Sequence, residues 1–275
     1  MKPQLLNLGC GATFHPEWIN IDLVSTTPEV RAVDVRQALP FAADSFDAVY
    51  HAHVLEHFEA QAGQKLLREC LRVLKPGGTL RVVVPDLEQI SELYLDRLRK
   101  SRAGDPRSAE DYDWLLLELY DQTVRTRSGG RMKDFLLAQP ANRTFILERI
   151  GQEAEAYFNA ETGPRRSWGQ RLRRLSLGKL SARLRWALTQ FAVGLVGGRQ
   201  ALSWLRHGRF RASGELHLWM YDRFSLQRAL EQAGARDVRV VGAQESEIPE
   251  YSRFGLDAIE GRPRKPDSLY VECRK

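Results

Sequence analysis

Short apolar runs, each stopped by glycine, proline or an acidic residue, mark the first hundred residues. These runs are Gln4–Leu8, Trp18–Leu23, Val30–Val35, Phe46–Tyr50 and Thr79–Val84. Runs of this length between turn-forming residues are typical of strands buried in a parallel sheet. The pattern therefore predicts five strands in this part of the chain.

Amphipathic helices alternate with the later strands. Leucines at three- and four-residue steps predict a helix over Ala60–Leu74, which a Lys-Pro-Gly-Gly turn ends. Asp86, with Gln89 three positions further on, predicts a capped start for a helix over Leu87–Lys100. The C-terminal part predicts a helix over Phe224–Ala233 and strands over Asp237–Val241 and Ser268–Cys273.

Residues 101–213 interrupt this alternation. Helical spacing recurs near Ala109–Thr126 and Thr144–Asn159, with no strand-like alternation between them. We therefore expect a doubly wound, mostly parallel α/β core formed by residues 1–100 and 214–275, with a helical insertion at 101–213.

Charge is distributed unevenly along the chain. The net charge is +6, yet Arg165–Arg211 holds twelve Arg or Lys and no Asp or Glu. The remainder holds 29 bases against 35 acids, so a strongly basic segment is inserted in a mildly acidic protein.

Cysteine content and hydropathy predict the compartment. Cys10, Cys70 and Cys273 are scattered and form no CxxC pair, which favours a reducing environment. No run resembles a signal peptide or reaches the roughly 18 apolar residues of a membrane span. We expect a cytoplasmic protein.

Glycines and strand-end acids suggest a ligand crevice. Gly9 and Gly11 follow the first strand, where glycine lets the backbone approach a ligand closely. Asp22 and Asp34 end the second and third strands, where acids accept hydrogen bonds from a nucleoside but are also common as solvated caps. A nicotinamide site is disfavoured, because Phe14 occupies the third glycine position of the dinucleotide fingerprint.

Four stretches in this order resemble class I S-adenosylmethionine (SAM) dependent methyltransferases of the type 11 kind. They are Leu6–Gly11, Leu39–His57, Leu67–Asp86 and the C-terminal helix–strand–strand. The resemblance implies a seven-stranded Rossmann-like sheet, SAM as cofactor and methyl transfer as activity. The most similar subset is often associated with surface polysaccharide genes, which implies a saccharide or similar polar acceptor.

The resemblance also implies roles for individual residues. Gly9, Cys10 and Gly11 would line the methionine and ribose parts of SAM, and Asp22 would hold the ribose hydroxyls. Asn7 stands where the family usually has an acid, so it keeps the hydrogen bonding without the charge.

Further cofactor contacts come from the third and fourth strands. The resemblance places Asp34 and Val35 against the adenine, and His51 and Ala52 beside the sulfonium. The link from Gly11 to the second strand has little room for a crossover helix, which leaves the position of Asp22 to be tested.

Methyl transfer to a hydroxyl benefits from a base that takes the proton. His53 and His217 are the leading candidates for a general base, followed by Asp86, because histidine titrates near neutral pH. Trp219 and Tyr221 are candidates for an aromatic wall against the acceptor. We add His57 to the substrate-binding candidates, although a helix-capping or packing role explains it better.

The spacing of His51, His53 and His57, with Glu56 between them, also suits a metal. Because the methyltransferases carry similar residues without a metal, we expect none.

Residues 165–211 admit three interpretations. Apolar residues recur mostly at three- and four-residue steps between arginines, which suits docking on an anionic membrane near a lipid-linked acceptor. Packing on the catalytic domain is the second interpretation, and RNA binding, for which no module is recognisable, the third. The uncharged stretch Trp186–Gly198 has 13 residues and is too short to span a bilayer.

Together these patterns predict a SAM-dependent O-methyltransferase for a saccharide-like acceptor, cytoplasmic and peripheral to the inner face of the membrane. A methyltransferase for natural products and a non-catalytic SAM-fold scaffold subunit are the alternatives. The oligomeric state is not predicted.

Overall fold

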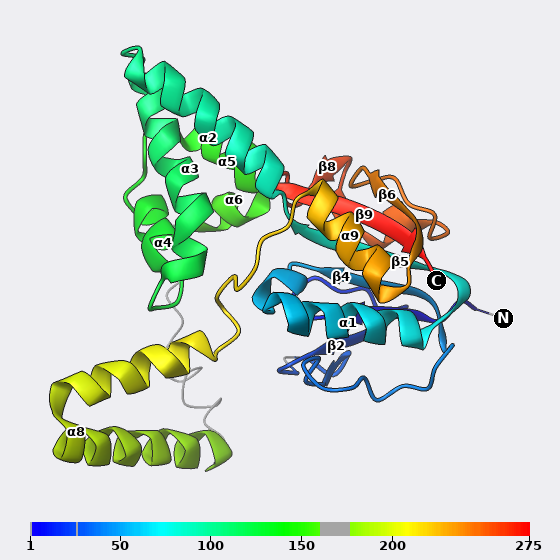
Figure 1. Cartoon of the computed structure of the whole chain (residues 1–275), viewed down its shortest axis with the longest axis horizontal. Helices are drawn as coiled ribbons and strands as arrows, with labels where there is room; N and C mark the ends of the chain where they lie inside the picture. Colours follow the sequence, from blue (N-terminus) through cyan, green and yellow to red (C-terminus); the bar gives the residue numbers. More distant parts are fainter. Residues whose placement is uncertain (1, 26, 160–176) are drawn as a thin grey trace.

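The computed structural model describes residues 2–25, 27–159 and 177–275, and its centre is a seven-stranded sheet (Figure 1). The strands run in the order β3-β2-β1-β4-β5-β9-β6. Their bounds are β1 Leu5–Leu8, β2 Ile19–Asp22, β3 Val30–Ala32, β4 Phe46–Ala52, β5 Leu74–Pro85, β6 Arg236–Val241 and β9 Ser268–Arg274. Strands β1 to β5 pair in parallel, and β9 is antiparallel to both β5 and β6. The predicted mostly parallel sheet is confirmed.

Two helices cover one face of this sheet, α1 (Ala60–Val73) and α9 (Arg223–Ala233) (Figure 1). Leu67 of α1 and Leu226 of α9 are completely buried against the sheet, as the leucine spacing of both helices predicts. The predicted Lys-Pro-Gly-Gly turn is absorbed into β5, which begins directly after α1 and keeps Gly77 in the left-handed conformation at φ +74°.

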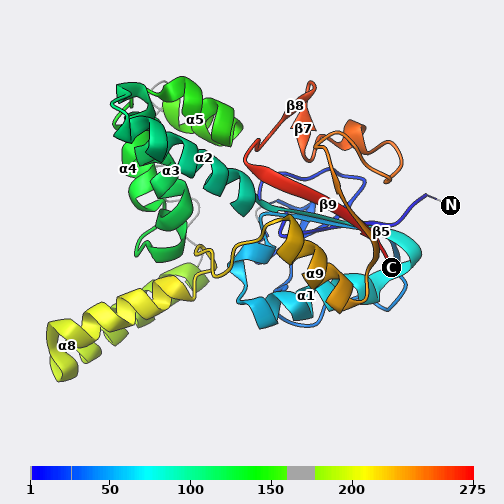
Figure 2. The ribbon, with the colours of Figure 1, turned by 45° about the horizontal axis from the view of Figure 1, so that its top comes forward.

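A C-terminal segment rather than helices covers the other face. Residues 242–267, called here the C-terminal cover, contain the 3₁₀ turn η3 (Tyr251–Phe254) and the short strands β7 (Ala258–Ile259) and β8 (Arg262–Pro263) (Figure 2). Trp18 and Tyr50 of the sheet pack against Tyr251 and Phe254. The short link between β1 and β2 holds no helix, and this cover buries the face that the link leaves open.

Arg81 of β5 ties the C-terminal cover to the sheet. Its side chain is fully buried, donates to Asp257 at 2.7 Å and to Glu272 at 2.9 Å, and lies over the ring of Tyr251. Three backbone carbonyls of the cover, those of Gly242, Ala243 and Glu245, accept its remaining hydrogens. The Arg81 guanidinium therefore holds the C-terminal cover against the sheet.

The insertion forms a helical body beside the sheet (Figures 1 and 2). Its helices are α3 Pro106–Val124, α4 Gly130–Leu137, α5 Arg143–Ile150 and α6 Gln152–Phe158. Helix α2 (Leu87–Arg102), which the sequence predicts within the 1–100 core, packs against α3 and so joins this body. They enclose a small core around Trp114, Leu136 and Ile146. The single helix predicted over Thr144–Asn159 is two helices, since Gly151 breaks it at φ +53°, and α4 was not predicted. The described part of residues 101–213 contains no strand.

Helix α8 (Leu177–Arg211) is a hairpin that projects from the body (Figures 1 and 2). Gly198, with φ +66° and ψ −166°, divides it into two halves. Arg206 donates to Gln190 at 2.8 Å and Arg209 stacks over Trp186, so the halves run antiparallel. Trp168, Leu172 and Leu175 of the predicted amphipathic pattern lie outside the described residues. None of the helices in the described ranges has the length and hydrophobicity needed to cross a bilayer.

Candidate active site

The turn after β1 is a close-packed backbone loop. Gly9 and Gly11 both adopt left-handed conformations, at φ +62° and +53°. A Cβ atom on Gly9 would lie 2.4 Å from Cγ2 of Val54, whereas one on Gly11 would meet nothing within 4 Å. Gly9 is therefore required both by its backbone conformation and by its contact with Val54, and Gly11 by backbone conformation alone.

Asp22 and Asn7 brace this turn. The Asp22 carboxylate accepts the backbone N–H of Gly11 at 2.8 Å, so the end of β2 lies beside the glycine turn despite the short link. Asn7 is buried and donates to Asn20 at 3.1 Å and to the Thr13 carbonyl at 3.3 Å. The Asn7 amide, which stands where the resemblance leads one to expect an acid, thus holds the loop after β1 through these two hydrogen bonds.

A cavity of about 410 Å³ opens beside the glycine turn. Gly9, Cys10 and Gly11 line it from β1, and Ala52 and His53 from the end of β4. Polar side chains from distant parts of the chain form the opposite wall, namely Glu153 of α6, Arg264 and Lys265 of the C-terminal cover, and Ser268 of β9. This volume lies within the range of small-molecule sites.

His53 lies at the edge of this cavity in an unusual conformation. It directly follows β4, and its φ of +53° is rare for a residue other than glycine. Nε2 lies 2.9 Å from the Ser268 hydroxyl, and Nδ1 lies 3.2 Å from Oε1 of Glu56. Strained residues of this kind cluster at functional sites, so the outlier supports a role for His53.

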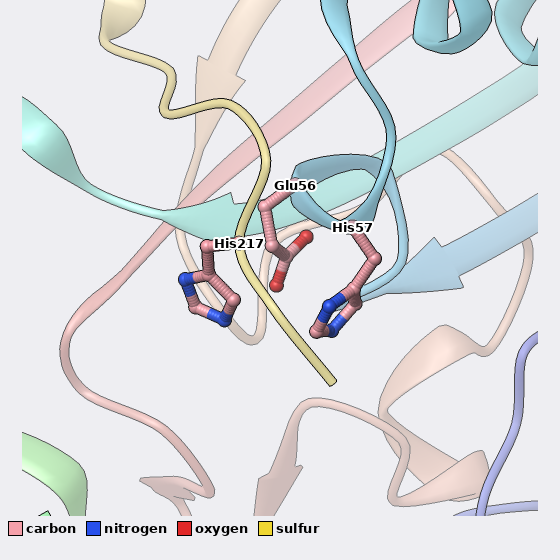
Figure 3. A group of neighbouring side chains, drawn as sticks. All are labelled: Glu56, His57 and His217. Atoms are coloured by element: carbon pink, nitrogen blue, oxygen red, sulfur yellow. The ribbon is translucent and has the colours of Figure 1, made fainter. Parts of the chain in front are cut away.

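Behind His53, a buried carboxylate is surrounded by imidazoles (Figure 3). Glu56, His57 and His217 each offer one ligand atom, and these atoms lie within 4.8 Å of one another. Burial would raise the pKa of Glu56, but neighbouring His53, His217 and His57 outweigh it and lower this pKa to about 2. Burial lowers the pKa of His217 to about 3. A carboxylate and two imidazoles at this separation could hold a divalent cation.

The structure assigns His51 to the interior rather than to the cavity wall formed by Ala52 and His53. Its side chain is fully buried, neither ring nitrogen has a hydrogen-bond partner, and burial lowers its pKa to about 4. The neutral ring is therefore the stable form over the physiological pH range. Its contact with a sulfonium stays a prediction.

Asp34 and Val35, which are predicted to face adenine, do not line the 410 Å³ cavity. Asp34 is held in a two-pronged ion pair by Arg36, with both contacts at 2.8 Å, and the hydrogen bond lowers its pKa. Val35 lines a second cavity, of about 490 Å³, together with His57 and Leu218. The adenine contacts stay a prediction.

The remaining candidates have structural surroundings. Asp86 caps α2 by accepting the backbone N–H of Gln89 at 3.1 Å, as its sequence position predicts. Tyr221 is 4% exposed within the core between the sheet and its helices, whereas Trp219 is 48% exposed. The structure thus brings His53, His57 and His217 together around Glu56. Of the two aromatic candidates, Tyr221 is a core residue and Trp219 a surface residue.

Sequence reasoning missed the groups that complete the cavity. Glu153 comes from α6, whereas Lys265 and Ser268 come from the C-terminal part of the chain, and Lys265 forms an ion pair with Glu153 at 3.1 Å. Glu56 was noted only as a neighbour of the histidines. The one local signal was its place in the mostly apolar run Val54–Phe58. A glutamate in such a run needs a partner if it is buried, as Glu56 is in the structure.

These residues fit SAM. The two left-handed glycines and the open space beside Gly11 leave a backbone cradle next to the cavity, and the Asp22 carboxylate lies at its rim. Backbone cradles with a strand-end acid suit a nucleoside with a polar tail. Gly9 to Gly11 would hold the tail, and Asp22 the ribose.

Residues 6–82 match the family model described as a methyltransferase domain. Together with the sheet order and the glycine turn, this match indicates a SAM-dependent methyltransferase domain in this part of the chain. No curated protein matches the chain.

Solved structures give weaker similarities. A SAM-dependent methyltransferase from Thermotoga maritima, described as a possible histamine N-methyltransferase, is 11% identical, with 100% of this chain and 83% of that chain covered at a TM-score of 0.37. A SAM-dependent methyltransferase from Archaeoglobus fulgidus is 10% identical, with 99% and 86% covered at a TM-score of 0.38.

Proposed function

We propose that the enzyme methylates a hydroxyl group of a saccharide or similar polar acceptor held in the 410 Å³ cavity. The observation that carries this proposal is the wall of Glu153, Arg264, Lys265 and Ser268 opposite the glycine turn. Such a wall offers both hydrogen-bond donors and acceptors, which is what a polyhydroxylated molecule needs. An apolar natural product would exclude water from these groups, among them the Lys265–Glu153 ion pair, without offering them any hydrogen bond.

The cofactor, when bound, supplies an electrophilic methyl group on a positively charged sulfur. The chain's own task is then to position the acceptor in line with that methyl. In the proposal, the backbone from Gly9 to Gly11 and the Asp22 carboxylate orient the cofactor, and Glu153 and Lys265 hold acceptor hydroxyls. Asn7 and Cys10 support the loop, while Asp34, Val35 and His51 keep their assigned cofactor roles.

His53 is proposed to receive the proton of the acceptor hydroxyl. It lines the cavity, whereas His217 is 6% exposed and Asp86 is occupied as a helix cap. Ser268 and Glu56 lie on opposite nitrogens of the His53 ring and fix its orientation. Glu56 is thus a positioning residue for His53.

The test is methyl transfer from radiolabelled SAM to a panel of free, nucleotide-linked and lipid-linked saccharides, with phenolic natural products as the alternative class. We expect His53→Gln to lower kcat at least about 100-fold while the Kd for SAM changes less than about threefold. His207→Gln, on the exposed α8, is the matched control and should retain full activity. Transfer to phenols alone, or unchanged kcat in His53→Gln, would contradict the proposal.

We further propose that α8 docks on an anionic membrane surface, close to a lipid-linked acceptor. Leu184, Leu188, Phe191 and Leu195 follow one another at steps of four, three and four, and they are between 59% and 76% exposed. Such spacing places them on one side of a helix. The hairpin carries seven Arg or Lys and no acid, which complements acidic lipid headgroups and disfavours a second copy of the same arm.

Flotation with phosphatidylglycerol and phosphatidylcholine vesicles tests this docking. We expect the whole chain to float only with the anionic vesicles, and Leu188→Ser/Phe191→Ser to abolish flotation. Leu95→Ser/Val124→Ser removes comparably exposed apolar groups from the helical body and should float normally. Indifference to lipid charge, preferential binding of RNA, or self-association through α8 would each overturn the membrane proposal.

A further inference from the structure

Glu56 presents an electrostatic problem that the methyl-transfer chemistry does not resolve. Its side chain is 0% exposed, and neither carboxylate oxygen accepts a well-aligned hydrogen bond within the described residues. The nearest nitrogen, Nδ1 of His53, lies 3.2 Å from Oε1, which leaves Oε2 without a partner among the described residues. A buried carboxylate is costly unless a positive charge or several hydrogen bonds compensate it.

The imidazoles of His57 and His217 also face Glu56. The His217 side chain is buried, and its ring centroid lies 5.0 Å from that of His57. Nδ1 of His57 lies 3.0 Å from the Leu216 carbonyl, so this nitrogen carries the hydrogen and Nε2 carries the lone pair. Histidines that bind metals commonly donate their second ring N–H to a carbonyl in this way.

The backbone around the cluster is already fixed. The Glu56 carbonyl accepts the N–H groups of Leu218 at 2.7 Å and Trp219 at 3.1 Å, and His217 donates its N–H to the Gln122 carbonyl at 3.0 Å. These bonds join the turn after β4, the insertion helix α3 and the segment that returns from the insertion. The side chains of Glu56, His57 and His217 therefore converge from segments whose relative position is set (Figure 3).

We propose that Glu56, His57 and His217 form a binding site for a divalent transition-metal ion, with Zn²⁺ as the best match to two imidazoles and one carboxylate. The ion supplies the positive charge that the buried carboxylate lacks. Donor atoms about 2.0–2.1 Å from Zn²⁺ lie roughly 3.4 Å apart, so the side chains rotate inward from their present separation of up to 4.8 Å.

This site departs from the expectation of no metal, and from the His51, His53 and His57 spacing that first suggested one. His51 is buried apart from the cluster, and His53 lines the cavity through its contact with Ser268. The ion acts as a clamp between the turn that carries His53 and the returning segment. Metal binding is independent of the identity of the acceptor.

Calorimetric titration of the chelator-treated whole chain with Zn²⁺ tests the site. We expect one ion per chain, a rise in Tm on binding, and an affinity at least about 100-fold weaker in Glu56→Gln and in His217→Ala. Glu59→Gln and His207→Ala, which replace exposed residues of the same types, should bind like the wild type. Co²⁺ loading should produce visible absorption bands from imidazole coordination that disappear in His217→Ala.

The outcomes separate this proposal from its competitors. Absence of stoichiometric binding, or equal loss of binding in His207→Ala, overturns the metal site. If Glu56→Gln fails to fold, His57→Asn, at a half-exposed position, replaces it with the same expected loss. Methyl transfer is measured separately, so its absence leaves the metal result intact.

Discussion

The carboxylate of Asp22 lies 2.8 Å from the backbone N–H of Gly11 and so joins the end of β2 to the glycine turn. This contact places a negative charge at the rim of the cofactor cradle. We expect Asp22→Ala to weaken SAM binding at least about tenfold, or roughly 1.4 kcal/mol, because charge-assisted hydrogen bonds are lost. Asp22→Asn retains an acceptor for Gly11 and should lose less.

Calorimetric titration with SAM measures both variants. Asp113→Ala, on the exposed surface of α3, is the control and should bind SAM with the wild-type affinity. Unchanged binding in Asp22→Ala would show that the ribose lies elsewhere.

The two glycines of the turn differ in what they tolerate. Gly11→Ala adds only left-handed strain, about 1 kcal/mol, because no atom lies within 4 Å of its Cβ position. Gly9→Ala adds a clash with Val54 at 2.4 Å and should cost about 3 kcal/mol. Denaturant unfolding gives both values.

A double-mutant cycle identifies the cause of that difference. If the clash with Val54 is responsible, Val54→Ala should recover at least about 1 kcal/mol of the loss in Gly9→Ala and nothing of the loss in Gly11→Ala. Equal effects of both glycine substitutions would show instead that the loop relaxes away from Val54.

The order of strands and helices was predictable because it depends on local patterns. Apolar runs between turn residues located every strand of the main sheet, and the leucine spacing located α1 and α9. The helical breaks at Gly151 and Gly198 depend on single glycines within continuous helical spacing, which a periodic pattern does not distinguish from tolerated glycines.

The site was less predictable because it is assembled over long sequence distances. Gly9, Gly11 and His53 lie in local motifs and could be identified there. Lys265 and Ser268 reach the cavity only because β9 returns beside β5. Likewise, Glu56 meets His217 only through the segment that returns from the insertion, so no local spacing relates them.

Arg81 should be among the most sensitive residues of the fold. Arg81→Met would leave the buried carboxylates of Asp257 and Glu272 without their common partner, and we expect a loss of about 3–5 kcal/mol in unfolding free energy. The exposed Arg31→Met should stay within about 0.5 kcal/mol of the wild type. Denaturant titration measures both, and a small loss in Arg81→Met would mean that water enters this core.

Because His51 is buried, we expect the free energy of unfolding to fall at acidic pH. Burial holds its folded-state pKa at about 4, below the ordinary value of 6.5, so the unfolded chain gains a proton at mildly acidic pH that the folded chain does not. Stability from this residue is therefore present above about pH 6.5 and is lost as the pH falls toward 4. Between pH 7 and pH 5 the loss is on the order of 2 kcal/mol.

His51→Leu should remove this part of the pH dependence and also replace two unpartnered ring nitrogens with apolar surface. We expect the variant to be at least as stable as the wild type at pH 7 and clearly more stable at pH 5, measured by denaturant unfolding at both values. His207→Leu, on the exposed hairpin, controls for the loss of a histidine in general. If His51→Leu and the wild type lose stability in parallel on acidification, His51 must gain its proton without unfolding, through a partner that only the charged ring engages.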